Sequence, residues 1–231
     1  MNTITKPLQN SDQNDFILND TEINKIIKFQ KNKESAILAI LFTDIVGYSS
    51  LVNSAGDHEA YKLLSYYEKV ILQIVDNSNG IIVKKIGDSF LAVFTEPSES
   101  LKVALTIQNK LSTDKKLHNI IKSRIGIHLG QVIFDNNFIP DIFGNHVNIA
   151  SRIMSLSKGN QILVSKSIYE NTMSWLKKPQ NAKKYNFKYF IRTKLKGIKD
   201  KYDLYEIFNS SLGSLGSNYK IILKRLFKYT S

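Results

Sequence analysis

AILAILFT, residues 36–43, is a continuous apolar run of strand length that ends abruptly at Asp44. An uninterrupted run of this kind is typical of a strand that is buried on both faces of a sheet. The following segment, residues 60–75, has apolar side chains at helical spacing and stops at the polar stretch 77–80. Together these patterns predict a central strand followed by an amphipathic helix that packs on the sheet.

A hairpin is predicted directly after this helix. The runs GIIVKKI at 80–86 and SFLAVFT at 89–95 are both strand-like, and only Gly87 and Asp88 separate them. A two-residue connection that contains glycine and aspartate is a strong signal for a tight hairpin. Asp88 is therefore expected at the tip of a turn.

The downstream segments continue the alternation of strands and helices. Residues 97–111 predict a second helix, and residues 124–134 predict a strand, a turn at Leu129 and Gly130, and another strand. The order strand, helix, strand, strand, helix, strand predicts an α+β fold with a ferredoxin-like βαββαβ core and helices on one face of the sheet. A further helix at 144–156 and extra C-terminal strands at 161–165, 188–195 and 202–208 are also predicted.

The net charge of +12 is concentrated in the last quarter of the chain. Residues 171–231 carry fourteen basic and three acidic side chains, whereas residues 36–170 carry thirteen and twelve. A near-neutral central segment is a poor electrostatic footprint for a nucleic-acid-binding domain, and the central strands offer apolar runs rather than aromatic residues between basic ones. We therefore expect no nucleic-acid partner.

The composition also bears on the compartment and on the kind of metal site. The sequence contains no cysteine, no apolar run of eighteen or more residues and no hydrophobic signal core near its N-terminus. Disulfides and thiolate metal sites are thereby excluded, while hard metals held by oxygen stay open. These features predict a cytoplasmic protein.

Two aspartates are candidates for a metal site. If the predicted hairpin pairs beside the first strand, Asp44 and Asp88 converge at one sheet edge, and two convergent carboxylates suit a divalent cation such as Mg²⁺. The alternative is structural, because Asp44 could cap the next helix and Asp88 could serve the turn.

Four sequence motifs help to decide between the metal-binding and the structural interpretation of these aspartates. ILFTDIVGYS, KKIGDSFLAVF, RIGIHLG and DIFGNHVNIASRI occur in this order and begin at residues 40, 84, 124 and 141. Together they resemble the class III adenylate and guanylate cyclase catalytic domain, and the resemblance covers roughly residues 35–208. It implies a catalytic domain at 35–209. Composition predicts a partly disordered lead-in at 1–34, and the run SSLGSLGS that begins at residue 210 predicts a linker before a short basic tail, together 210–231.

The resemblance implies roles for the first two motifs. Asp44 and Asp88 match the two aspartates that bind the metal ions in the family. The backbone around Ile45 and the loop that contains Gly47 match the segment that meets the metal and the phosphates, which suits a loop opening a helix with free N–H groups.

The fourth motif supplies two further candidates. Asn148 and Arg152 lie four residues apart on a predicted helix, so both project from one helical face and could reach one ligand. By resemblance, Asn148 orients the ribose and Arg152 stabilises the charge that develops at the transferred phosphorus. The planar guanidinium suits phosphate oxygens. The alternative is a polar helix face.

The choice of base is implied by Lys84 and Asp141, which match the purine-reading positions of the family. Lysine can donate to N1 of adenine, and a carboxylate can accept from its 6-amino group. Guanine presents the opposite pattern, so this pair should reject it. The alternative is that Lys84 points into solvent, as Lys85 could.

Two other residues are assigned by short matches. Lys196, in the run LKG, matches a late lysine that contacts the triphosphate in the family. The alternative is a turn in a strand hairpin that completes the sheet. His128, in GIHLG, has no metal-ligand companion at useful spacing, and we interpret it as a structural strand histidine.

The resemblance as a whole implies an adenylate cyclase that converts ATP to 3′,5′-cyclic AMP and pyrophosphate with two Mg²⁺ or Mn²⁺ ions per site. In the family the metal aspartates and the base-reading residues come from different subunits, so a homodimer is implied. The alternatives are a cyclase for another nucleotide, giving cyclic GMP or a cyclic pyrimidine nucleotide, and a non-catalytic nucleotide-binding homologue. The acceptor of the 3′-hydroxyl proton stays open between solvent, substrate phosphate and a carboxylate such as Asp44.

The C-terminal tail forms a separate feature. In residues 219–228, apolar side chains fall on one helical face and basic side chains on the other. This pattern suits weak contact with an anionic membrane surface, and a docked helix or a frayed basic end are the alternatives.

Overall fold

The structure is a computed structural model that describes residues 34–135 and 141–210. The elements are β1 (Ser35–Ile45), α2 (Tyr48–Ala55), α3 (Asp57–Asp76), β2 (Gly80–Ile86), β3 (Ser89–Phe94), α4 (Pro97–Thr113), β4 (Ser123–Asp135), β5 (Asp141–Phe143), α5 (Asn145–Leu156), β6 (Ile162–Ser165), α6 (Lys166–Leu176), α7 (Pro179–Ala182), β7 (Tyr185–Lys194) and β8 (Lys201–Asn209). The described residues thus follow the predicted βαββαβ order and add C-terminal strands.

A single sheet organises these elements. Its strands run in the order β2-β3-β1-β4-β6-β8-β7, and the short β5 pairs with β4 beside this path. All pairings are antiparallel except that of β4 with β6. The sheet is therefore antiparallel-rich, and the α+β fold class is confirmed.

The apolar run 36–43 forms the centre of the sheet. β1 pairs with β3 on one side and with β4 on the other, and residues 38–45 are all buried. Alternate residues of a strand point to opposite faces, so Ala39 and Leu41 enter one core while Leu38 and Ile40 enter another. The continuous apolar pattern is thus explained by burial on both faces.

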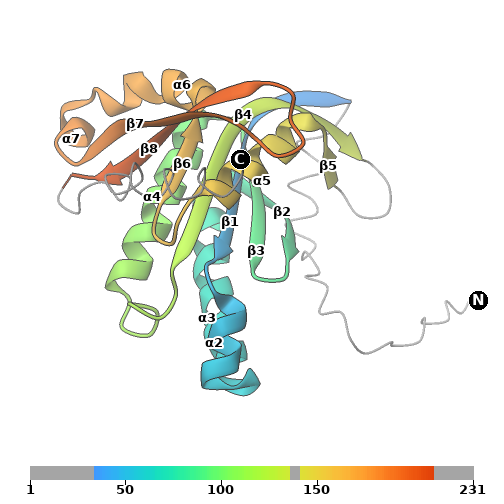
Figure 1. The fold of residues 1–231 in the computed structure, drawn as a ribbon. Coiled ribbons are helices and arrows are strands. Elements are labelled where there is room, and N and C mark those ends of the chain that lie inside the picture. Colours follow the sequence, from blue (N-terminus) through green and yellow to red (C-terminus); the bar gives the residue numbers. More distant parts are fainter. Residues whose placement is uncertain (1–33, 136–140, 211–231) are drawn as a thin grey trace, which may run out of the picture.

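The two faces of the sheet carry different helices (Figure 1). α3, α4 and α6 contribute Tyr67, Leu101 and Ile168 to the larger core on one face. α5 packs on the opposite face, where Ala150 and Met154 join the smaller core. The helices of the βαββαβ core therefore share a face as predicted, whereas α5 lies across the sheet from them.

One local prediction is wrong. The turn expected at Leu129 and Gly130 is absent, because β4 continues without interruption through both residues, where Gly130 pairs with Leu38 of β1. Gly130 has another use: a Cβ there would lie 2.2 Å from Cγ of His146 on α5. The glycine thus allows a helix to approach the strand closely. In the sequence alone, such a glycine looks the same as a glycine in a turn.

Three elements between β4 and β7, namely β5, α6 and α7, were not predicted. For α6 a signal existed, since its buried residues Ile168, Thr172 and Leu176 are spaced four apart. No helix among the described residues is both long and apolar enough to cross a membrane. The lead-in at 1–33 and the basic tail lie outside the described residues, and no finding supports the predicted membrane-surface contact of the tail.

Candidate active site

The structure brings the two candidate metal aspartates to one end of the sheet. Asp44 is the second-last residue of β1 and is only 7% exposed. Asp88 lies in the connection between β2 and β3. Because β3 pairs with β1, this connection lies beside Asp44, and Ser89 Oγ donates a hydrogen bond of 2.6 Å to Asp44 Oδ1. Asp44 does not cap a helix, since the N-cap of α2 is Gly47.

The charge of Asp44 acts on the pKa of Asp88. Burial raises the pKa of Asp88, and the negative charge of Asp44 raises this pKa further. Backbone N–H groups of Asp88 and Ile45 act in the opposite direction on the pKa of Asp88. Two like charges at one site disfavour one another, so a nearby positive charge stabilises the pair.

Arg124 supplies part of that charge, and the sequence analysis missed it as a site residue. Its Nε donates to Asp44 Oδ2 at 2.8 Å, and its second terminal nitrogen donates to the same oxygen. The register places Arg124 of β4 directly opposite Asp44 of β1. The residue stands in the quoted motif RIGIHLG, but only the pairing of β1 with β4 shows its partner.

This donor set fits a divalent ion of the Mg²⁺ class. Within residues 34–135 and 141–210, no cluster of three or more histidine, aspartate or glutamate side chains forms a closed metal site. Mg²⁺ typically binds one or two protein carboxylates and completes its shell with water and phosphate oxygens. Asp44 and Asp88 offer that arrangement, and a bound cation would lower the pKa of Asp88, which burial and the charge of Asp44 raise.

In the loop after Asp44, the candidate residues Ile45 and Gly47 can offer a ligand only their backbone. The Ile45 side chain is buried at 4% exposure, so only its backbone can face a ligand. Gly47 is exposed and has φ 78°, a left-handed conformation that favours glycine, and α2 begins at the next residue. The chain thus turns sharply from the buried strand into the helix.

Lys84 and Asp141 form a second cluster. Lys84 Nζ donates to Asp141 Oδ2 at 2.5 Å, and the same ammonium lies 5.7 Å from the centroid of the Phe143 ring. Lys84 is therefore not a free solvent-facing lysine. The neighbouring Lys85 pairs instead with Glu68 of α3. The structure thus brings together the two residues expected to read the base.

Asn148 and Arg152 are exposed on one face of α5, one turn apart. The buried face of this helix sits directly on β4, because a Cβ at Gly126 would lie 2.1 Å from the Met154 backbone nitrogen. Glycines at 126 and 130 thus let α5 approach the sheet closely. Among the described residues, no ion pair or hydrogen bond links Asn148 or Arg152 to Asp44 or Asp88.

The remaining candidates lie apart from these clusters. Lys196 is exposed in the connection between β7 and β8, next to Gly197 with φ 78°. His128 is buried on β4, and its Nε2 lies 2.9 Å from Nδ1 of His146. Burial, and then the neighbouring His146, lower the pKa of His128 to about 3. A neutral buried ring agrees with a structural role.

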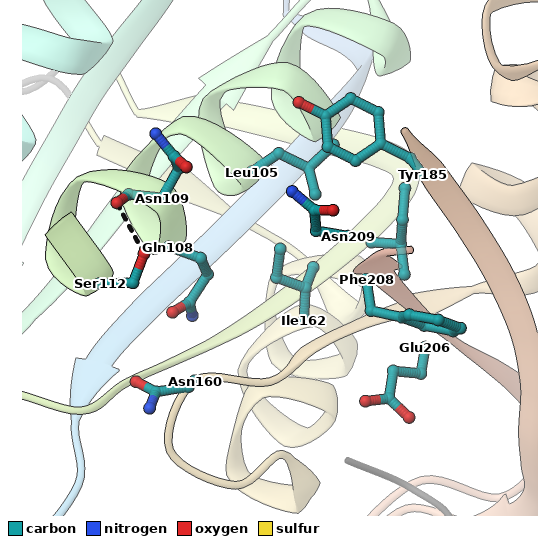
Figure 2. A pocket seen from close by; sticks show the side chains of 11 residues that line it. Leu105, Gln108, Asn109, Ser112, Asn160, Ile162, Tyr185, Glu206, Phe208 and Asn209 are labelled. Carbon is teal, nitrogen blue, oxygen red and sulfur yellow. Dashed lines mark hydrogen bonds between the residues drawn. The ribbon is translucent and has the colours of Figure 1, made fainter. Parts of the chain in front are cut away.

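A cavity of about 260 Å³ lies elsewhere and is not the candidate site. Figure 2 shows Leu105 of α4, Ile162 of β6 and Tyr185 of β7 in its wall. These elements belong to the face of α4 and α6, and none of the residues predicted for catalysis lines this cavity.

Comparison with known proteins shows the family of the chain. A family model described as Adenylate and Guanylate cyclase catalytic domain matches residues 30–209. The chain therefore belongs to the adenylate and guanylate cyclase family.

Individual relatives agree with this membership. An adenylate cyclase of Anabaena cylindrica is 32% identical over 152 residues, which cover 58% of this chain and 30% of that protein. The adenylyl cyclase CyaB from P. aeruginosa shares the fold with a TM-score of 0.67 at 19% identity, over 76% of this chain and 95% of that one. An Adenylate/Guanylate Cyclase/Hydrolase from Silicibacter pomeroyi has a TM-score of 0.62 at 29% identity, over 75% and 96% of the two chains.

Proposed function

We propose that the protein is an adenylate cyclase that converts ATP to 3′,5′-cyclic AMP and pyrophosphate. The observation that carries this proposal is the convergence of Asp44 and Asp88 at one end of the sheet, in a chain that also pairs Lys84 with Asp141. The first pair suits divalent ions and triphosphate, and the second suits adenine. Family membership supports the reaction class, and the Lys84–Asp141 pair supports the choice of base.

Asp44, Asp88 and the backbone at Ile45 would hold two Mg²⁺ or Mn²⁺ ions, and exposed backbone at Gly47 would meet the phosphates. Bound ions would lower the pKa of the ribose 3′-hydroxyl and neutralise charge on the triphosphate. A cation on Asp44 also competes with Arg124 for the same carboxylate oxygen. The released guanidinium would then be available to a phosphate oxygen.

The reaction is an intramolecular phosphoryl transfer. The 3′-oxygen forms a bond to the α-phosphorus, the bond from that phosphorus to the bridging oxygen of the β-phosphate breaks, and pyrophosphate leaves. The proton of the 3′-hydroxyl passes to solvent, to substrate phosphate or to Asp44. Asn148 orients the ribose, Arg152 stabilises charge at the α-phosphorus, and Lys196 contacts the triphosphate.

Lys84 and Asp141 read the base by donor and acceptor pattern. When adenine enters, the ammonium donates to N1 and the carboxylate accepts from the 6-amino group. The hydrogen bond between Lys84 and Asp141 is thus replaced by hydrogen bonds to the base. Guanine would place its N1 donor against the ammonium and its 6-oxo acceptor against the carboxylate. Such mismatches leave partly buried polar groups unpaired and so disfavour guanine.

The test is product identification by mass spectrometry, with the full chain incubated separately with ATP, GTP, UTP and CTP and Mn²⁺. We expect cyclic AMP from ATP, and a loss of at least about 100-fold in rate for Asp44→Asn. Cyclic product from another nucleotide alone would overturn the choice of base, and no cyclic product from any of the four would overturn the enzyme assignment.

A second arm tests the reading of the base directly. The double variant Lys84→Glu with Asp141→Lys keeps an ion pair but inverts donor and acceptor, so the GTP to ATP rate ratio should rise at least about 100-fold. Lys85→Met is the matched control, because Lys85 pairs with Glu68 instead, and it should keep the preference for ATP.

A further inference from the structure

Three fully buried hydroxyl groups form a closed triangle beneath the candidate metal site. Thr43 of β1, Tyr67 of α3 and Ser123 of β4 each have 0% exposure. Thr43 Oγ1 lies 3.1 Å from Tyr67 Oη and 2.6 Å from Ser123 Oγ, and Tyr67 Oη lies 3.2 Å from Ser123 Oγ. In a closed ring each hydroxyl can donate one hydrogen bond and accept one, so all three donors are satisfied without water.

The triangle occupies the positions just before two site residues. Thr43 precedes Asp44, and Ser123 precedes Arg124. Because strand residues alternate between faces, the hydroxyls lie on the α3 face while the Asp44–Arg124 ion pair lies on the other. The triangle therefore ties α3 to both strands at the point where Asp44 and Arg124 face each other in the register.

The start of β4 is held from other directions as well. The Ser123 carbonyl accepts a hydrogen bond of 2.9 Å from Gln108 Nε2 of α4 and one of 2.7 Å from the Asn160 backbone N–H. Val46 N–H donates at 2.8 Å to the Lys122 carbonyl across the same strand pair. Tyr67 is thus the contact through which α3 joins this network.

The two carboxylates also affect the pKa of Tyr67. Burial raises its pKa to about 12, hydrogen bonds from Ser123 and Thr43 act against this, and the charges of Asp44 and Asp88 raise it further. The hydroxyl therefore lies within electrostatic range of both aspartates and keeps its proton at ordinary pH. Its ring packs edge-to-face on Phe90 at 6.2 Å between centroids, a contact that phenylalanine could make equally.

Packing alone therefore does not require a hydroxyl at position 67. A fully satisfied buried polar network selects one geometry, whereas an apolar contact tolerates small displacements. We propose that Tyr67, acting through Thr43 and Ser123, is a positioning residue that fixes the ends of β1 and β4 and so aims Asp44 at the divalent ions. This inference rests on the proposed metal-binding role of Asp44 and Asp88.

The experiment measures Mn²⁺ binding to the full chain without nucleotide, from the electron paramagnetic resonance signal of free Mn²⁺. Tyr67→Phe should raise the Mn²⁺ dissociation constant at least about 10-fold, as is usual when a residue that orients a metal ligand is removed. Tyr66→Phe is the matched control. It also loses one tyrosine hydroxyl, which donates to Asp114 Oδ2 at 3.0 Å, and its dissociation constant should stay within about twofold of wild type.

Thermal unfolding of each variant separates weak binding from failure to fold. If Tyr67→Phe does not fold, Ser123→Ala takes its place, because it removes another vertex and leaves Thr43 and Tyr67 within 3.1 Å. A dissociation constant within about twofold of wild type in the folded variant would overturn the inference. The same holds if wild type shows no Mn²⁺ binding that Asp44→Asn removes.

This result is distinguishable from failure of the proposed function. A wild-type chain that binds Mn²⁺ through Asp44 but forms no cyclic nucleotide would refute the cyclase assignment. Weaker binding in Tyr67→Phe would still support the positioning role in that case.

Discussion

At the scale of single residues, the charge balance around Asp44 is the main feature. Asp44 and Asp88 place two carboxylates together, and Arg124 is the cation that neutralises Asp44. The ion pair is largely buried on the aspartate side and about one third exposed on the arginine side. Losing the arginine would leave a buried charge unpaired.

Arg124→Leu tests this balance. We expect the free energy of unfolding in metal-free buffer to fall by about 2–4 kcal/mol, because one member of a largely buried pair is removed. Mn²⁺ should restore part of the loss, since the ion replaces the guanidinium on Asp44. Arg192→Leu, whose exposed guanidinium is 4.0 Å from Asp203, should cost under about 1 kcal/mol. Equal losses in chemical denaturation would contradict the proposed role of Arg124.

His128 gives a prediction about pH. Its pKa is about 3 in the folded chain against an ordinary value of 6.5, so between these values the unfolded chain binds more protons. The free energy of unfolding should therefore decrease as pH falls below 6.5, with a slope of up to about 1.4 kcal/mol per pH unit from this residue. His128→Asn should remove that slope in denaturation experiments at pH 7.5 to 5. The exposed control His118→Asn should retain it.

At the scale of elements, α5 links the sheet to the candidate catalytic residues. Ile149, Ala150, Ile153 and Met154 bury one face of the helix, while Asn148 and Arg152 project from the other. The position of these two side chains therefore depends on how closely the helix lies on β4, which Gly126 and Gly130 determine.

Gly126→Ala should move α5. The new Cβ would lie 2.1 Å from the Met154 backbone nitrogen, and backbone cannot rotate away, so we expect a cost of about 1–3 kcal/mol in the free energy of unfolding. Displacing Arg152 by about 1 Å should lower kcat about 100-fold, while Mn²⁺ binding stays near wild type. Gly130→Ala should be milder, since its Cβ meets the movable His146 side chain. Wild-type kcat in Gly126→Ala would show that the close approach is not required.

At the scale of the whole molecule, the candidate residues fall into separate groups. Asp44 and Asp88 form one group, whereas Asn148 is exposed and neither Arg152 nor Lys196 forms an ion pair within the part of the chain that the structure describes. We propose that a two-fold homodimer completes the site, with the metal aspartates of one chain facing Lys84, Asp141, Asn148 and Arg152 of the other. Such a closed interface would create two equivalent sites.

Complementation tests this arrangement. An equimolar mixture of Asp44→Ala and Arg152→Ala chains should recover about one quarter of wild-type activity, because half of the dimers are mixed and each has one intact site. A mixture of Asp44→Ala with Asp88→Ala is the control, since both defects fall in the same half-site and no intact site can form. A first mixture as inactive as its parents would refute the shared site.

Elements whose signals are local can be predicted from the sequence. Residues 38–43 of the apolar run lie in a strand that is buried on both faces, the Gly87–Asp88 connection becomes a hairpin, and the helical spacing of 60–75 lies within α3. These predictions succeed because a strand or helix pattern depends on neighbouring residues. The four motifs also predict the cyclase family, because residue type and spacing within a motif are local features of the sequence.

Contacts between distant parts of the chain, by contrast, follow from how the strands and helices pack together. Arg124 binds Asp44 because the β1–β4 register sets them opposite each other, and Tyr67 joins Thr43 and Ser123 because α3 packs on those two strands. Gly130 supports a close helix contact within an unbroken strand. Such relations join residues far apart in the chain, so no local pattern records them. The sequence predicts the two carboxylates as a metal site, whereas the contacts of Arg124 and Tyr67 near them follow only from the folded structure.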